Sequence, residues 1–304
     1  MRIAGATIAL TILLSIVDPE KLSQALSQSD VGFLIPALLL AVASPLLTSA
    51  RLRLFLSATG TQVPYSRCFF ASLCGLSLNL FLPARGGDLV KLAYLRKEGK
   101  PSWGVLAGAA LLERGFDVLA LGMIGLTASL VLGLRNASIT AGVIVLVTIT
   151  GLLLLPKMGS LPIVGKKAEN FSTIVQKTSQ RKLHLLGCFC TCCVCWAVNS
   201  MIMGLLIKAF DNSTSFTHAF AATPPSILAG IVPVSLWGIG TRDGALAYFL
   251  QGITLPENAL SAGFLYTALV YWLLGLIGLP ALLFARRKTK TITDDSTQSN
   301  ALGS

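Results

Sequence analysis

Long apolar segments separated by short polar ones run along almost the whole chain. Six of them approach the length of a membrane-spanning helix, which needs about 20 apolar residues. They cover residues 3–17, 32–50, 103–134, 139–155, 184–208 and 259–284. The pattern predicts an all-α, polytopic helical membrane protein. We expect residues 1–285 to form one membrane domain and residues 286–304 to form a polar, disordered cytoplasmic tail.

Two further apolar segments, 68–88 and 219–244, are interrupted by proline and glycine. Proline cannot donate a backbone hydrogen bond, and glycine permits backbone angles that other residues resist, so both tend to end helices. The breaks contain Pro83, Gly86 and Gly87 in the first segment and Pro233, Gly238, Gly240 and Gly244 in the second. Non-helical backbone survives at membrane depth only where protein or water covers it. Each broken segment is therefore a candidate site, either as a re-entrant hairpin or as a full crossing.

The distribution of Lys and Arg sets the orientation of these segments, because cytoplasmic loops collect positive charge. If both broken segments return to the side from which they enter, 18 of the 24 basic residues, Arg51 and Lys91 among them, lie on the cytoplasmic side. This arrangement predicts six full spans, two opposed hairpins and both termini in the cytoplasm. The eight hydrophobic segments then resemble an inverted-repeat transporter. The alternative is eight full spans, which would place the basic residues of 91–100 outside.

Composition supports a membrane location. The chain is 54% hydrophobic and 12% charged, whereas soluble proteins have about 25% charged residues. A net charge of +11 could indicate a nucleic-acid partner. The positive charges gather on one predicted side of the membrane, however, and form no basic–aromatic stripe. We therefore expect no nucleic-acid binding.

Charged residues also occur within or beside the apolar segments. They are Arg85, Asp88, Glu113, Arg114, Asp117, Arg242 and Asp243. A charge at the bilayer centre costs about 2.5–3.5 kcal/mol, so these residues must pair or contact water. Glu113 and Asp117 share one helix face. We expect this face to meet Arg85 and Arg242, and the whole set to bind a substrate; the alternative is a set of salt bridges near helix ends.

The sequence contains no recognisable catalytic, metal or cofactor motif. Five of its seven cysteines gather between Cys188 and Cys195 on a predicted span, where small apolar thiols pack well, whereas zinc sites use defined pairs in loops. The histidines, His184 and His218, lie at span ends on opposite sides. Most tryptophans are expected to be interfacial anchors or core residues. Trp237 is the exception, because it lies inside the second break, where we expect it to line the site.

Three motifs, taken together, resemble a known family. They are Asn79-x-x-x-Pro83-x-Arg85-x-Gly87-Asp88, Glu113-Arg114-x-x-Asp117 and Pro233-x-Ser235-x-x-Gly238-x-Gly240-Thr241-Arg242-Asp243-Gly244. In this order they resemble the flippase-like transmembrane domain of lysylphosphatidylglycerol synthases, over roughly residues 1–285. The resemblance implies a protein of the prokaryotic cytoplasmic membrane with the charged motif residues at its substrate site.

In two-part members of this family, the transmembrane domain is understood to move an aminoacylated phospholipid to the outer leaflet, and a separate cytosolic domain makes that lipid. The present sequence contains no such domain, so the resemblance implies transport without synthase activity and without a cofactor. Members that are fused to glycosyltransferases, or act as their partners, imply lipid-linked sugars as another substrate class.

The leading interpretation is a translocator that moves a phospholipid, an aminoacyl-phospholipid or a lipid-linked sugar between leaflets. Arg85 and Arg242 would hold its phosphate, since guanidinium groups make bidentate contacts, and the acids would hold an amine or sugar hydroxyls. A small-solute or ion-coupled transporter and a non-transporting partner subunit of an envelope enzyme are the alternatives. An intramembrane enzyme would need a nucleophile or a metal set near the breaks, where only carboxylates occur.

Overall fold

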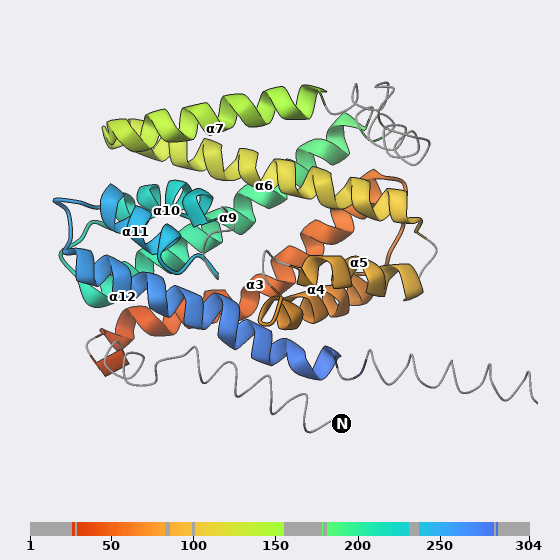
Figure 1. The fold of residues 1–304 in the computed structure, drawn as a ribbon, viewed down its shortest axis with the longest axis horizontal. Coiled ribbons are helices and arrows are strands. Elements are labelled where there is room, and N and C mark those ends of the chain that lie inside the picture. Colours follow the sequence, from red (N-terminus) through yellow and green to blue (C-terminus); the bar gives the residue numbers. More distant parts are fainter. Residues whose placement is uncertain are drawn as a thin grey trace, which may run out of the picture.

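The structure is a computed structural model that describes residues 26–27, 29–82, 86–98, 101–154, 178, 181–230, 237–282 and 284. Every regular element in this part of the chain is a helix (Figure 1). The predicted all-helical class is therefore confirmed. The predicted span 3–17 and the tail after residue 285 lie outside the described residues, as do Pro83, Arg85 and Pro233.

Among the described residues, five helices are long and apolar enough to cross a membrane. They are α3 (Val31–Ala58), α6 (Trp103–Val131), α7 (Arg135–Leu154), α9 (Lys182–Phe210) and α12 (Pro256–Thr267), which continues through the π-helix η3 (Ala268–Leu273) to Leu282. Each coincides with a predicted span. α3 extends beyond the predicted end at residue 50, because buried apolar residues recur at Leu52, Phe55 and Leu56. The protein is therefore a multi-pass membrane protein.

Four shorter helices in the same part of the chain form two antiparallel pairs. α4 (Tyr65–Asn79) packs on α5 (Gly87–Glu98), and α10 (Phe216–Gly230) packs on α11 (Thr241–Phe249). At 1.5 Å per residue these helices are about 22, 18, 22 and 14 Å long, which is less than the hydrocarbon thickness of about 30 Å. Each predicted segment is thus interrupted as expected, but the second short helix runs past the predicted end of the segment, to Glu98 in α5 and to Phe249 in α11.

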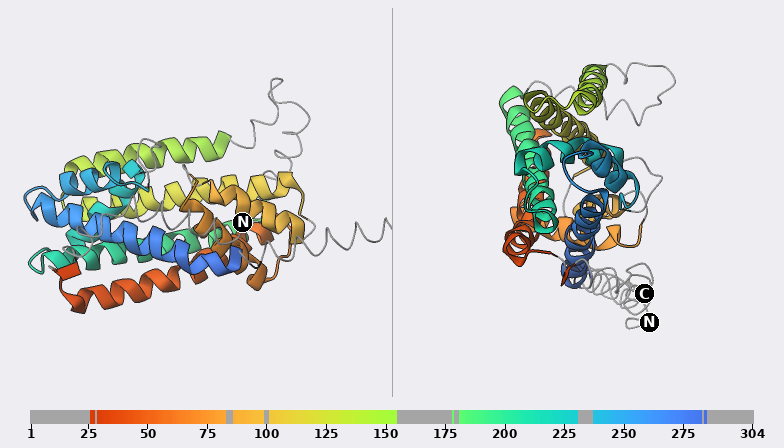
Figure 2. Two further views of the ribbon diagram at one scale, coloured as in Figure 1. Left: turned by 60° about the horizontal axis from the view of Figure 1, so that its bottom comes forward. Right: turned by 90° about the vertical axis from the view of Figure 1, so that its left-hand side faces the viewer.

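The two pairs lie toward opposite ends of the long helices (Figure 1), and the left view of Figure 2 also separates them along this axis. The described residues next to the two breaks, by contrast, contact each other. The indole N–H of Trp237 donates to the carbonyl oxygen of Asn79 at 3.0 Å. Leu80, the next residue, packs with Trp237 and Trp272. The ends of the two pairs are therefore joined by a hydrogen bond and by aromatic packing.

The order long, short, short, long occurs twice, from α3 to α6 and from α9 to α12. The helices have 28, 15, 12 and 29 residues in the first unit and 29, 15, 9 and 27 in the second. The last long helix of each unit packs on the first short helix of the other unit. Gly125 of α6 lies against Pro224 of α10, and Gly278 lies against Leu73 and Ser77 of α4. Each glycine lies 22 residues after the first residue of its helix.

The two units pack along α3 and α9, which contact each other through the centre of the bundle. One buried cluster gathers around Leu52, Phe55 and Leu106, and a second gathers around Ile202 and Leu206. α7 lies at the edge of the bundle (Figure 2, right view). Its buried residues are two alanines, and its other face exposes Ile, Val and Leu. In a membrane such a face contacts lipid.

The loop after α9 is held by Asp211. Its carboxylate accepts hydrogen bonds from the hydroxyls of Ser213, Thr254 and Thr214 at 2.5, 2.7 and 2.7 Å. These bonds hold the pKa of Asp211 well below its usual range, with Ser213 contributing most. The loops that precede α10 and α12 are thereby tied together at the end of the bundle opposite α4 and α5.

A side chain at position 87 should separate α4 from α5. A Cβ on Gly87 would meet the carbonyl oxygen of Gly75 and the backbone nitrogen of Asn79. We expect Gly87→Ala to lower the free energy of unfolding by about 1–3 kcal/mol, measured by unfolding in detergent.

Gly187→Ala is the matched control, because nothing lies within 4 Å of a Cβ there. On α9 this change should stabilise the protein by roughly 0.5–1 kcal/mol, the usual gain of alanine over glycine in a helix. Equal effects of the two substitutions would contradict the close packing of α4 on α5.

Candidate functional site

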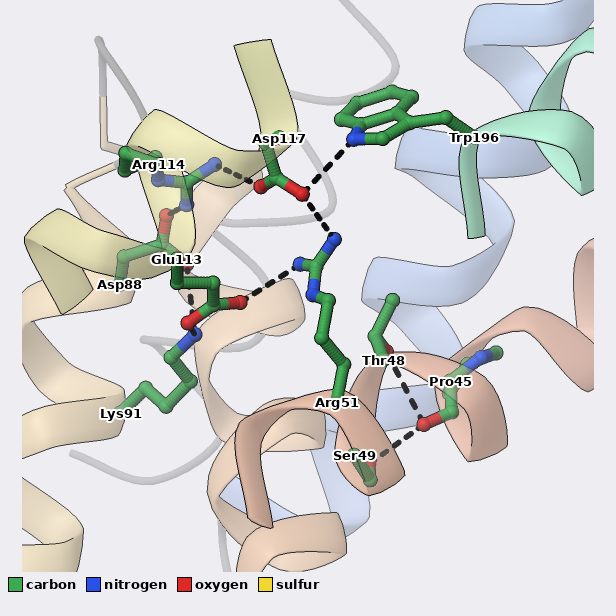
Figure 3. Close-up of polar contacts among 10 residues, drawn as sticks. All are labelled: Pro45, Thr48, Ser49, Arg51, Asp88, Lys91, Glu113, Arg114, Asp117 and Trp196. Atoms are coloured by element: carbon green, nitrogen blue, oxygen red, sulfur yellow. Dashed lines mark hydrogen bonds and ion pairs between the residues drawn. The ribbon is translucent and has the colours of Figure 1, made fainter. Parts of the chain in front are cut away.

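Arg51 joins two acidic side chains inside the bundle (Figure 3). Its terminal guanidinium nitrogens contact Glu113 at 2.7 Å and Asp117 at 2.6 Å. Arg51, Glu113 and Asp117, which we call the buried triad, are only 7%, 2% and 3% exposed. Buried charges are tolerated when close partners satisfy their polar atoms, and the planar fork of arginine can satisfy two carboxylates at once. The triad therefore holds α3 against α6.

Trp196 of α9 brings a third helix to the buried triad. Its indole N–H donates to Oδ1 of Asp117 at 2.9 Å. About two turns before Arg51, α3 contains Pro45, which cannot donate a hydrogen bond to the preceding turn. The hydroxyl of Thr48 donates to the Pro45 carbonyl oxygen at 3.2 Å (Figure 3). The turn of α3 that precedes Pro45 thus lacks one backbone hydrogen bond of a regular helix.

A more exposed group of charges adjoins the buried triad. The ammonium nitrogen of Lys91 on α5 lies 3.4 Å from Glu113 and 3.9 Å from Asp88. Arg114 of α6 bonds directly to Asp88 and lies 3.7 Å from Asp117. The exposed fraction of the side chain rises from 9% at Lys91 to 28% at Asp88 and 38% at Arg114. We call these three residues and the triad together the charge network; it extends from the interior to an accessible edge.

The charge network borders a cavity of about 140 Å³. All of its members except Asp117 line the cavity, together with polar residues of α3, α4 and α9. Leu76, Val270 and Leu274 add an apolar border. Three basic and three acidic residues balance in the network. The arrangement can therefore hold a small polar group without an excess of either charge.

Arg242 of α11 is engaged in the second pair of short helices. Its Nε and Nη2 atoms contact Asp243 at 2.8 and 2.5 Å, and Nη2 also donates to the carbonyl oxygen of Gly263 and to Thr267 at 2.6 and 2.8 Å. The guanidinium lies 4.8 Å from the ring centre of Tyr266. Arg242 and Asp243 are 2% and 4% exposed. These contacts dock α11 on α12 and leave Arg242 outside the cavity lining.

Trp237 connects the two breaks and does not line this cavity. Besides its hydrogen bond to Asn79, its ring packs edge to face with Trp272 at a centroid distance of 6.0 Å. The side chain of Asn79 in turn accepts a hydrogen bond from the backbone N–H of Gly87 at 2.9 Å. Trp237 thereby holds the end of α4, and α4 positions the beginning of α5, which carries Asp88.

The glycines of the second break allow this path of the chain. Gly238 and Gly240 have φ angles of 81° and 94°, in the left-handed region that favours glycine. A Cβ on Gly238 would lie 3.1 Å from Cβ of Arg242. Gly244 lies inside α11 with open space around it. The first two glycines are therefore required by the turn, and the third is not.

We expected the helix face of Glu113 and Asp117 to meet Arg85 and Arg242. The part that concerns Arg242 was wrong, because within the described part of the chain the basic partners of this face are Arg51, Lys91 and the neighbouring arginine on α6. Arg242 is instead paired with the aspartate next to it. Arg85 lies outside the described residues.

Arg51 and Lys91 were assigned to cytoplasmic loops because each follows the predicted end of an apolar segment. A usable signal was present in both cases, since apolar residues continue past each charge. Leu52 and Leu56 follow Arg51, Leu92 and Leu95 follow Lys91, and all four are buried. A basic residue after which apolar positions continue at helical spacing belongs to the helix that carries it. Of the predicted site residues, Asp88, Glu113 and Arg114 line the cavity.

Five long apolar helices in the described part of the chain, together with a charge network of equal numbers of cations and acids, define a multi-pass helical membrane protein. The chain matches the family described as lysylphosphatidylglycerol synthase TM region over residues 2–278. This match covers most of the chain, so the protein belongs to that family, as its three motifs predicted. Membership indicates a membrane protein involved in lipid metabolism. No curated protein matches the sequence at a significant level.

Arg242 and Arg114 should respond differently to the same substitution. Lysine keeps the charge but cannot reproduce the fork of Arg242 toward Gly263 and Thr267, and each buried polar group left unbonded costs about 1–3 kcal/mol. We expect Arg242→Lys to lower the free energy of unfolding by about 2 kcal/mol or more.

Arg114→Lys should change the same quantity by less than about 1 kcal/mol, because its side chain is 38% exposed. Chemical unfolding of both variants in detergent measures the difference. If Arg114→Lys were the more damaging of the two, the assignment of Arg242 to packing and Arg114 to the cavity would have to be reversed.

Proposed function

We propose that this protein moves a membrane lipid between the two leaflets, with a phospholipid, an aminoacyl-phospholipid or a lipid-linked sugar as the substrate. The observation that carries the proposal is the balanced charge network beside a cavity within an apolar bundle. Charged headgroups cross hydrocarbon only at high cost, whereas acyl chains stay in it freely. The network supplies the polar path, and Leu76 and Val270 supply an apolar border for the first carbons of the chains.

The size of the cavity supports a headgroup as its occupant. Sites that enclose a whole drug-sized molecule have volumes of about 300–1,000 Å³, and this cavity has about 140 Å³. A headgroup could enter while the rest of the lipid remains in the bilayer. By its motif position, Arg85 belongs to the same site in this proposal.

The topology in this proposal has α4–α5 and α10–α11 as re-entrant hairpins that enter from opposite faces. Each of the four helices is too short to cross the hydrocarbon core alone, and the pairs meet at Trp237 and Asn79. Exposed basic residues gather at the α4–α5 end; they are Arg53, Arg67, Arg96, Arg181 and Lys182. This end is then the cytoplasmic face of a prokaryotic inner membrane, with both termini on that side.

Transport rather than catalysis accounts for the chemistry of the site. The charges of the network neutralise one another across α3, α5 and α6, as a path for a charged headgroup requires. Movement of the lipid between leaflets would be passive or coupled to the movement of an ion. A glycosyltransferase or another lipid-modifying enzyme would supply the substrate and is the partner that this role favours.

Leaflet exchange in proteoliposomes tests the proposal. Purified protein is reconstituted with fluorescent phosphatidylglycerol, phosphatidylethanolamine or a lipid-linked sugar, and the outer leaflet is quenched chemically. We expect the wild type to accelerate exchange of at least one lipid and Arg114→Gln to slow that exchange about tenfold, because it removes a charge from the cavity edge. Arg135→Gln is the matched control, since Arg135 is exposed at the beginning of α7, far from the cavity.

Exchange no faster than in protein-free liposomes, for every lipid tested, would rule out the proposal. Uptake of small solutes by the same liposomes would then favour the solute transporter. An absence of both activities would favour a partner subunit.

A further inference from the structure

Asp88 differs from the other two acids of the charge network. Glu113 and Asp117 have side chains that are 3% and 4% exposed, whereas the side chain of Asp88 is 28% exposed. Asp88 lies between two cations from different helices, Lys91 of α5 and Arg114 of α6 (Figure 3). It is the acid that could leave the network without passing through the core.

We infer that Asp88 is an internal competitor that occupies the place of a ligand phosphate, and that a phosphodiester bearing one negative charge displaces it from Lys91 and Arg114. This inference rests on the proposed function, because it identifies the headgroup chemistry that the same cavity accepts. It also makes Asp88 a residue that sets specificity, a role different from that of Glu113 and Asp117.

The donors around Asp88 suit a phosphate. Among the described residues, Glu113 is the only hydrogen-bond acceptor for the Lys91 ammonium, at 3.4 Å, and an ammonium carries three donors. Arg114 presents a guanidinium fork, which matches two oxygens of a phosphate as well as those of a carboxylate. A phosphate placed between them would gain contacts that the single carboxylate of Asp88, 3.9 Å from Lys91, does not supply.

The charge balance selects the class of phosphate. Without Asp88, the three cations of the charge network, Arg51, Lys91 and Arg114, keep Glu113 and Asp117 as the acids of the network. One positive charge then remains in the network, in which Arg85 is not counted because it lies outside the described residues, and a phosphodiester carries one negative charge. A phosphomonoester or a diphosphate carries up to two or more and would leave an excess negative charge in a largely buried site, which is unfavourable.

The position of Asp88 on its helix allows the exchange. Asp88 lies in the first turn of α5, directly after Gly87. Its side chain is 28% exposed and lines the polar cavity, so it could turn away from Lys91 and Arg114 without entering the packed core. Lys91 and Arg114 would keep their helix positions, and the phosphate would replace one anion with another of the same charge.

Removing the competing charge should strengthen binding. The probe is dioctanoyl phosphatidylglycerol, titrated calorimetrically into purified protein in detergent. We expect Asp88→Asn to lower its dissociation constant about five- to tenfold, and Arg114→Gln to raise it by at least as much. Binding to Asp88→Asn should also weaken more steeply with salt than binding to the wild type, because an uncompensated positive charge then attracts the ligand.

Asp30→Asn is the matched control. Asp30 is exposed and caps the beginning of α3, and asparagine caps helices equally well, so binding should equal that of the wild type. An unchanged dissociation constant for Asp88→Asn, with a melting temperature like that of the wild type, would overturn the competitor role. So would equal tightening by Asp30→Asn.

Two further probes identify the ligand class. Dioctanoyl phosphatidic acid and inorganic phosphate should bind at least tenfold more weakly than the phosphodiester lipid. If either bound as tightly, the phosphodiester assignment would be wrong, and tight binding of inorganic phosphate would indicate a site for the free anion. Binding without leaflet exchange would reject the proposed transport and leave this inference intact, whereas exchange without the Asp88 effect would reject this inference alone.

Discussion

Arg51 is the side chain on which the arrangement of charges depends. Two carboxylates on one face of α6, Glu113 and Asp117, are almost fully buried, and an isolated carboxylate removed from water is destabilised by several kcal/mol. Arg51 contacts both at hydrogen-bond distance, so α3 supplies one of the positive charges that this face of α6 requires. With Lys91, Arg114 and Asp88 added, three cations and three acids balance across the network, and a polar cavity can persist among apolar helices.

Close backbone packing brings the first pair of short helices to this network. The approach of Gly75 to Gly87 sets α5 against α4, and the hydrogen bonds of Asn79 connect this pair to the second break. The two four-helix units share an order of helices but differ in content. A polar cavity adjoins α4–α5, whereas in α10–α11 Arg242 is engaged by Asp243, Gly263 and Thr267.

The sequence was most informative about features that depend only on residues close together in the chain. Segment length and hydropathy predicted the described spans, and the glycines at 86–87 and 238–240 predicted the two breaks, because both effects act within a few residues. The pairing of charges depends on which helices pack together, and it could not be predicted. The contact of Arg242 with the adjacent Asp243 is an example, because neighbouring residues on a helix do not normally face each other. Arg242 also donates to the backbone carbonyl oxygen of Gly263, and the types of residue in a sequence do not indicate which backbone carbonyl a side chain will contact.

The most direct test of this account is whether charge balance, rather than any one contact, stabilises the network. Free energies of unfolding in detergent would be compared for Arg51→Met and for Arg51→Met combined with Asp117→Asn. The single change leaves three acids facing two cations, and we expect a loss of about 3–5 kcal/mol or a failure to fold. The double change restores the balance and should recover most of that loss. A single variant as stable as the wild type, or a double variant no better than the single one, would contradict the account.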